Sequence, residues 1–181
     1  MRSNKDRSMI PQDDALGDDS PPLTRFSIRR AEPADCDTVA RLYRTTADAE
    51  WPFMVRLTPA EDRAFFRAAF DAGVVWSARD ESDQIVGFCA LRRGWIDHLF
   101  VAHLWHGRGV GQALLKRALS GRRRVRLWTF HRNARSRDFY RRQSFAEVLF
   151  TDGAHNEEQE PDVMLEWMRG SVRPKLTSCR S

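Results

Sequence analysis

The segment HGRGVGQALLKRAL, from His106 to Leu119, places three glycines at alternate positions directly before the apolar spacing of a helix. Glycines at a helix start expose backbone N–H groups at the positive end of the helix dipole, where phosphate groups bind readily. Two nucleotide-binding motifs fail on spacing, because the pattern is G-x-G-x-G and because Gln112, not lysine, follows Gly111. A phosphate cradle and a tight turn with close helix packing both remain open at this point.

Charge is unevenly distributed along the chain. Its 181 residues carry a formal net charge of +5, and the window from His98 to Arg137 contains no Asp or Glu. A long basic region of this kind often faces an anion. The alternative is that arginine decorates a solvated surface. A basic module that binds nucleic acid is a rival interpretation of the same window.

Other classes of protein are less compatible with the composition. No apolar run approaches the ~20 residues of a membrane span, and the N-terminus lacks the apolar core of a signal peptide. The three cysteines lie far apart, and the loose H-x4-H-x2-H spacing of His98, His103 and His106 is not that of a metal site. We therefore expect a cytoplasmic protein with no membrane partner and no metal.

One domain is expected between two tails. Residues 1–24 are rich in Asp, Ser and Pro and predict a disordered N-terminal tail, and residues 169–181 predict a flexible basic tail. Between the tails, the spacing of apolar residues over 25–168 predicts strands and helices in the order β-α-α-β-β-β-α-β-α-β-β. Strands are expected at 26–29, 74–78, 85–91, 95–101, 125–130, 145–149 and 163–167. The central strand-helix-strand unit requires a right-handed parallel crossover, so the sheet is mixed and the class is α/β or α+β.

Two spaced motifs resemble those of one enzyme superfamily. Leu99-Phe100-Val101 followed by HGRGVG at 106–111 resembles the acetyl-CoA signature of the GNAT N-acetyltransferases, whose core is Q/R-x-x-G-x-G/A. NARSRDFYRRQSF at 133–145 resembles that family's second block, N-x-x-A/S-x-x-x-Y-x-x-x-G-F. The resemblance covers about residues 25–168. It departs at His106, where Gln or Arg is usual, and at Ser144, where Gly is usual.

The resemblance implies both a fold and an activity. The fold is a mixed, mostly antiparallel sheet of six to seven strands flanked by about four helices, with a central parallel β-α-β unit for acetyl-CoA. The activity is direct transfer of the acetyl group of acetyl-CoA to a primary amine, on a small molecule or on a peptide or protein. A homodimer is left open. The alternatives are an acyl-CoA-binding regulatory domain without turnover and the nucleic-acid module.

Roles for individual residues follow from the same resemblance. The pantetheine arm would lie along Leu99, Phe100 and Val101, and the diphosphate would sit on the loop of His106, Gly107, Arg108, Gly109, Val110 and Gly111. Tyr140 would be the general acid, since a phenol is protonated at neutral pH, and it would also contact the cosubstrate. Asn133 lies two helical turns earlier, on the same face. Ser144 would end that helix in a left-handed conformation, at about 1 kcal/mol more than glycine.

The acceptor side is less defined in the sequence. Asp97, two residues before Leu99, is a candidate general base, with a strand-end charge paired to an arginine as the alternative. Glu50, His98 and His131 are further candidates for the base. Glu50, Trp51 and Phe53 are expected to shape the acceptor pocket from the loop between the first two helices. The acidic segment 152–160 is expected to be a solvated loop, and contact with a cationic acceptor is its alternative.

Overall fold

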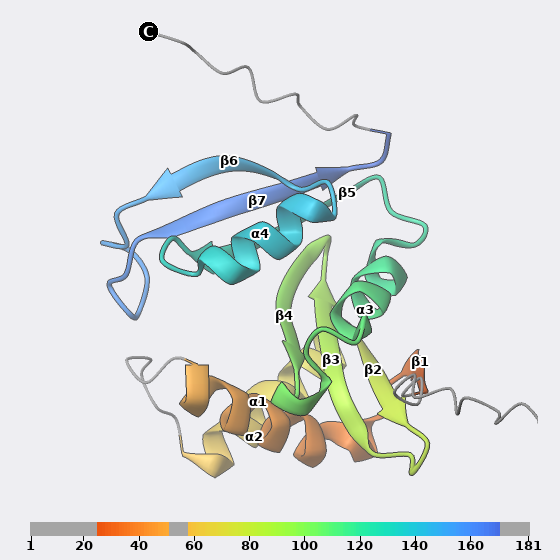
Figure 1. The fold of residues 1–181 in the computed structure, drawn as a ribbon. Coiled ribbons are helices and arrows are strands. Elements are labelled where there is room, and N and C mark those ends of the chain that lie inside the picture. The colour runs from red at the N-terminus through yellow and green to blue at the C-terminus, as the bar shows by residue number, and fades with distance from the viewer. Residues whose placement is uncertain (1–24, 51–57, 171–181) are drawn as a thin grey trace, which may run out of the picture.

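A seven-stranded sheet organises the chain in a computed structural model that describes residues 25–50 and 58–170 (Figure 1). Its order is β1-β2-β3-β4-β5-β7-β6. The strands are β1 Phe26–Arg30, β2 Val74–Asp80, β3 Ile85–Arg92, β4 Trp95–Val101, β5 Arg124–Phe130, β6 Ala146–Thr151 and β7 Asp162–Met168. The helices are α1 Cys36–Glu50, α2 Pro59–Ala72, α3 Val110–Leu119 and α4 Ala134–Arg142, with 3-10 turns at Pro33–Asp35 and His103–Trp105. The predicted order of strands and helices is confirmed. The tails expected at 1–24 and 171–181 lie outside the described residues.

Local sequence accounts for the start of α2. The Thr58 hydroxyl accepts a hydrogen bond from the Glu61 amide at 3.3 Å, and the Glu61 carboxylate accepts one from the Thr58 amide at 2.6 Å. Pro59 occupies the first turn, where its missing N–H costs no hydrogen bond. Gly73 follows the helix because a Cβ there would lie 2.2 Å from the Leu91 carbonyl oxygen.

The sheet opens between β4 and β5. These strands run parallel and pair at one position, Trp95 with Arg126, where the Arg126 amide also donates to the Gly94 carbonyl at 3.0 Å. Every other pair of neighbouring strands is antiparallel and is registered over at least five positions. The predicted mixed sheet with one parallel crossover is confirmed, and the two strands separate beyond their single contact.

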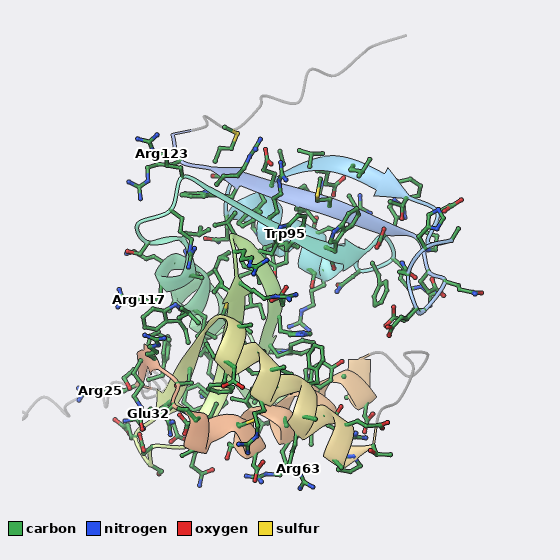
Figure 2. All side chains as sticks on the ribbon, turned by 180° about the vertical axis from the view of Figure 1, so that it is seen from behind. Arg25, Glu32, Arg63, Trp95, Arg117 and Arg123 are labelled. Carbon is green, nitrogen blue, oxygen red and sulfur yellow. The ribbon has the colours of Figure 1, made fainter. Side chains whose placement is uncertain are left out.

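Two hydrophobic cores lie on opposite faces of the sheet. Under α3, the fully buried Leu114 and Leu115 pack with Leu165. Under α1 and α2, Phe66 packs with Phe88. Charged side chains such as Arg63 and Arg123 point away from the sheet (Figure 2). Within the described ranges, no helix combines the length and the apolar character needed to cross a membrane.

Candidate functional site

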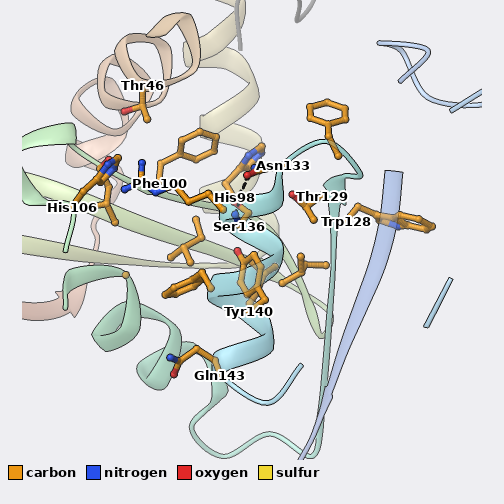
Figure 3. A pocket seen from close by; sticks show the side chains of 18 of the residues that line it. Thr46, His98, Phe100, His106, Trp128, Thr129, Asn133, Ser136, Tyr140 and Gln143 are labelled. Atoms are coloured by element: carbon orange, nitrogen blue, oxygen red, sulfur yellow. Dashed lines mark hydrogen bonds between the residues drawn. The ribbon is translucent and has the colours of Figure 1, made fainter. Parts of the chain in front are cut away.

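A cavity of about 750 Å³ occupies the opening between β4 and β5 (Figure 3). This volume is in the range of small-molecule and cofactor sites. Its walls come from β4, the loop and first turn of α3, β5 and α4, and α1 and the β6–β7 connection complete the lining. The cavity therefore joins both motifs of the sequence to segments that no motif marked.

The loop of residues 106–111, called the glycine loop below, has an open face. Gly107 and Gly109 have φ values of 75° and 82°, in the left-handed region that favours glycine. A Cβ built on either glycine would meet no protein atom within 4 Å, and both residues line the cavity. The Ala113 amide donates to the Gly109 carbonyl at 3.0 Å, so the amides just before it belong to the first turn of α3, which lacks intrahelical acceptors. A helix start of this form is suited to an anion.

His106 ties the glycine loop to the end of β4. Its Nε2 lies 2.8 Å from the Val101 carbonyl oxygen, and because a carbonyl only accepts, Nε2 carries the hydrogen. The Arg108 guanidinium lies over the Trp105 ring at 5.6 Å. Five of the six predicted loop residues line the cavity, and Arg108 is the one that does not.

Tyr140 lies on the α4 side of the cavity, opposite Leu99, Phe100 and Val101 of β4, all of which line it. Its ring is buried between Phe139 and Phe145, with centroids at 5.1 and 5.3 Å. Burial raises the pKa of Tyr140 well above its ordinary value, and the nearby Cys89 adds to the effect. The phenol is therefore a hydrogen donor at any physiological pH.

Asn133 also lines the cavity and has a structural task as well. Its side-chain oxygen accepts from the Ser136 amide at 2.9 Å, which caps the start of α4. Its amide nitrogen donates to the Ser136 hydroxyl at 2.8 Å. Asn133 and Tyr140 both line the cavity, as expected for residues on one face of the helix.

Asp97 is the extra residue of a bulge. The register between β3 and β4 shifts so that Ala90 pairs with His98 and Leu91 with Ile96, which leaves Asp97 between them. Asp97 lines the cavity, as a general base would, and its carboxylate accepts a hydrogen bond from Arg92 Nε at 3.4 Å, as a strand charge paired with an arginine would. Burial raises the pKa of Asp97, although Arg92 opposes the shift.

His98 also lines the cavity, within a cluster of aromatic rings. Its ring centroid lies 5.5 Å from Tyr43, 5.3 Å from Phe65 and 5.4 Å from Phe66. Burial lowers the pKa of His98 to about 4, so the imidazole is neutral near pH 7. No group of three or more His, Cys, Asp or Glu side chains is arranged to hold a metal ion in the part of the chain that the structure describes.

Of the three residues predicted to shape the acceptor pocket, the structure describes only the backbone of one. Glu50 ends α1, and Trp51 and Phe53 lie outside the described residues. The cavity instead receives side chains that lie outside both motifs. These are Tyr43, Thr46, Trp128, Thr129, Asn156, Glu158 and Asp162. Part of segment 152–160 is therefore cavity wall, and the expectation of a purely solvated loop there is corrected.

Known proteins share this architecture. A model of the acetyltransferase (GNAT) domain matches residues 71–147. Over 120 residues the chain is 28% identical to the peptidyl-lysine N-acetyltransferase YjaB of Escherichia coli K12, covering 66% of this chain and 82% of that protein. The solution structure of apo YjaB from E. coli has a TM-score of 0.65 at 25% identity, over 78% of this chain and 97% of that one. Arabidopsis thaliana NAA60 in complex with a bisubstrate analogue has the same fold, with a TM-score of 0.66 at 21% identity over 81% of this chain and 100% of that one.

Proposed function

Because the chain belongs to the GNAT superfamily of N-acetyltransferases, we propose that it transfers the acetyl group of acetyl-CoA to the side-chain amine of a lysine in a peptide or protein. The observation that carries this proposal is the presence, in one cavity, of an open-faced glycine loop and a buried, protonated Tyr140. The relatives named peptidyl-lysine N-acetyltransferase favour lysine over a small-molecule amine.

The residues present fit acetyl-CoA, which supplies an acetyl group activated as a thioester. Gly107 and Gly109 leave room for a diphosphate against the first amides of α3. The β4 residues 99–101 face the space where β4 and β5 separate, so their backbone is available to the pantetheine arm. His106 acts in this proposal by holding the loop against Val101, as a positioning residue.

Direct attack by the amine fits the chain better than an acyl-enzyme route. Cys36 and Cys89 are buried, neither lines the cavity, and burial raises the pKa of both thiols. In the direct route the amine nitrogen bonds to the acetyl carbon as the carbon–sulfur bond breaks. Tyr140 gives its proton to the departing sulfur, and Asp97 receives the proton that the nitrogen loses.

The test is release of free CoA thiol from acetyl-CoA in the presence of a lysine peptide. Tyr140→Phe keeps the ring between Phe139 and Phe145 and removes the donor, so we expect kcat to fall about 10²- to 10⁴-fold. Calorimetric titration should show nearly unchanged affinity for acetyl-CoA. Unchanged kcat would remove Tyr140 from the chemistry. If acetyl-CoA binds but no amine causes release of the CoA thiol, the protein is instead a regulatory domain.

A further inference from the structure

One wall of the cavity is formed by segments far apart in the sequence. Tyr43 and Thr46 come from α1, and Asn156, Glu158 and Asp162 come from the β6–β7 connection and the start of β7. Figures 1 and 2 show that connection on the same side of the molecule as the end of α1. We call these five residues the acceptor wall.

The loop that carries Glu158 has a fixed shape. The Asn156 side chain donates to the Glu160 carbonyl at 2.7 Å and accepts from the Glu160 amide at 3.1 Å, which closes the loop around Glu158. Gly153 has a φ of 83°, and a Cβ there would lie 2.3 Å from the Glu160 carbonyl carbon, so the two sides of the loop are in close contact. Glu158 is therefore presented to the cavity by a rigid segment.

The carboxylates of the acceptor wall differ from the other acids of the β6–β7 hairpin that lie close to arginines. Arginine neutralises Glu147, Glu160 and Glu166 through Arg137, Arg132 and Arg126, at 2.8, 2.5 and 2.6 Å. By contrast, Glu158 makes no hydrogen bond or ion pair with any residue in 25–50 or 58–170.

Asp162 accepts hydrogen bonds from neutral groups, Asn156 Nδ2 at 3.2 Å and the Thr151 hydroxyl. Negative charge in a partly enclosed cavity without a cationic partner is costly. The wall thus carries negative charge that a bound cation would neutralise.

A second observation on the same wall also indicates a ligand. Thr46 is only 8% exposed and lines the cavity (Figure 3), yet its side-chain hydroxyl makes no hydrogen bond to any residue that the structure describes. Tyr43, on the same wall, lies within the field of Glu158: burial raises the pKa of its phenol most, and the charges of Asp62 and then Glu158 raise it further. A hydrogen-bonding group and negative potential therefore meet where an acceptor would enter.

We propose that the acceptor wall selects lysines that are flanked by basic residues, with Glu158 as the residue that reads the flanking positive charge. This selectivity rests on the lysine acetyltransferase function proposed above. Asp162, unlike Glu158, is held by hydrogen bonds from Thr151 and Asn156, and its charge adds to the negative potential of the wall. The preference is electrostatic, so it weakens as salt is added.

The experiment compares two peptides of equal length with one acceptor lysine, one flanked by arginines and the other by glutamates. Wild-type protein should have the higher kcat/KM for the arginine-flanked peptide. Glu158→Gln should reduce that ratio about tenfold, which is near the lower end of the energy of a charge-assisted hydrogen bond. Glu158 is the residue to change because it makes no structural hydrogen bond, whereas an Asp162 variant could disturb the loop.

Glu157→Gln is the matched control. Glu157 is the exposed neighbour on the same loop and does not line the cavity, so its substitution should leave the peptide ratio unchanged. Equal kcat/KM for both peptides, or an equal effect of the two glutamine variants, overturns the selectivity while leaving lysine acetylation in place. If neither peptide causes release of CoA from acetyl-CoA, both the lysine acetyltransferase function and the selectivity are overturned. Preference for spermidine over both peptides overturns the assignment to a peptide.

Discussion

Gly109→Ala isolates the role of the glycine loop in binding acetyl-CoA. Gly109 has a φ of 82° and is the N-cap of α3. An added methyl group would meet no protein atom within 4 Å, so it causes no clash inside the folded chain. What the substitution changes is the backbone preference at this position and the space in front of the first amides of α3.

Both effects have estimable sizes. An L-residue in the left-handed region costs about 1–2 kcal/mol, which lowers Tm by roughly 2–4 °C per kcal/mol in a protein of this length. A methyl group that separates the diphosphate from one backbone amide removes a hydrogen bond to a charged group, about 1.5–3 kcal/mol. We therefore expect acetyl-CoA to bind about 10- to 150-fold more weakly.

Gly121→Ala provides the control for strain. Gly121 follows the other end of α3 with a φ of 77°, also has no protein atom near its Cβ, and does not line the cavity. The two alanine variants should lose similar amounts of Tm, and only Gly109→Ala should lose affinity for acetyl-CoA in calorimetric titration. Equal affinities for the two variants would refute the assignment of the glycine loop to the diphosphate.

Two further substitutions test stability. Ser144 has a φ of 68°, so Ser144→Gly should stabilise the fold by about 1 kcal/mol in urea unfolding without changing kcat or KM; no gain in stability would show that the turn is unstrained in solution. His98→Phe should make stability less sensitive to acid. Burial lowers the pKa of His98 to about 4, below its ordinary value of 6.5, so the unfolded chain takes up the proton first as the pH falls. Stability is then complete above about pH 6.5 and falls towards pH 4, by on the order of 1–2 kcal/mol between about pH 7 and 5. The phenylalanine variant should lack that part of the loss, and an identical loss in both proteins would contradict the argument.

The elements of the fold could be predicted because their signals are local. The capping box at Thr58 and Glu61 lies within one turn, and the alternation of Trp95–Val101 gives β4 with the bounds that the structure has. Bulges are different, because the extra residue depends on the partner strand. Alternation alone placed Asp97 on the face of Leu99, and the register shift against β3 gives it a position between two pairs.

The gathering of the two motifs in one cavity could be predicted for a related reason. Val101, Gly109 and Tyr140 all belong to one β-α-β unit and the helix after it, so their order in the sequence is close to their order around the cavity. His106 illustrates the limit. The sequence marks it as a departure from the motif, and only the three-dimensional turn shows that its ring reaches the Val101 carbonyl.

The acceptor wall could not be predicted, since its parts come from opposite ends of the domain. Thr46 and Glu158 are more than a hundred residues apart and share no spacing that a motif could record. Thr46 looks like an ordinary helix residue, and Glu158 is one of several acids in a loop. Their proximity in the cavity depends on the fold of the whole sheet.

The basic window from His98 to Arg137 has a structural explanation that composition alone did not provide. Its arginines meet acids that come later in the chain, because β6 and β7 pack beside β5 and α4. Arg124 and Arg126 share Glu166, and Arg137 holds Glu147 through two hydrogen bonds at 2.8 and 3.1 Å. Arg117 lies over the Trp76 ring at 4.2 Å.

These contacts occupy arginines that a nucleic-acid module would present to phosphate. Within the window, Arg135 lines the cavity on the side of α4, where it can face the phosphates of acetyl-CoA. Glu158 and Asp162, which have no arginine partner among the described residues, lie on the acceptor wall instead. Opposite charges on the two parts of one cavity match a polyanionic cosubstrate and a cationic acceptor, and they disfavour the binding of either molecule in the other's place.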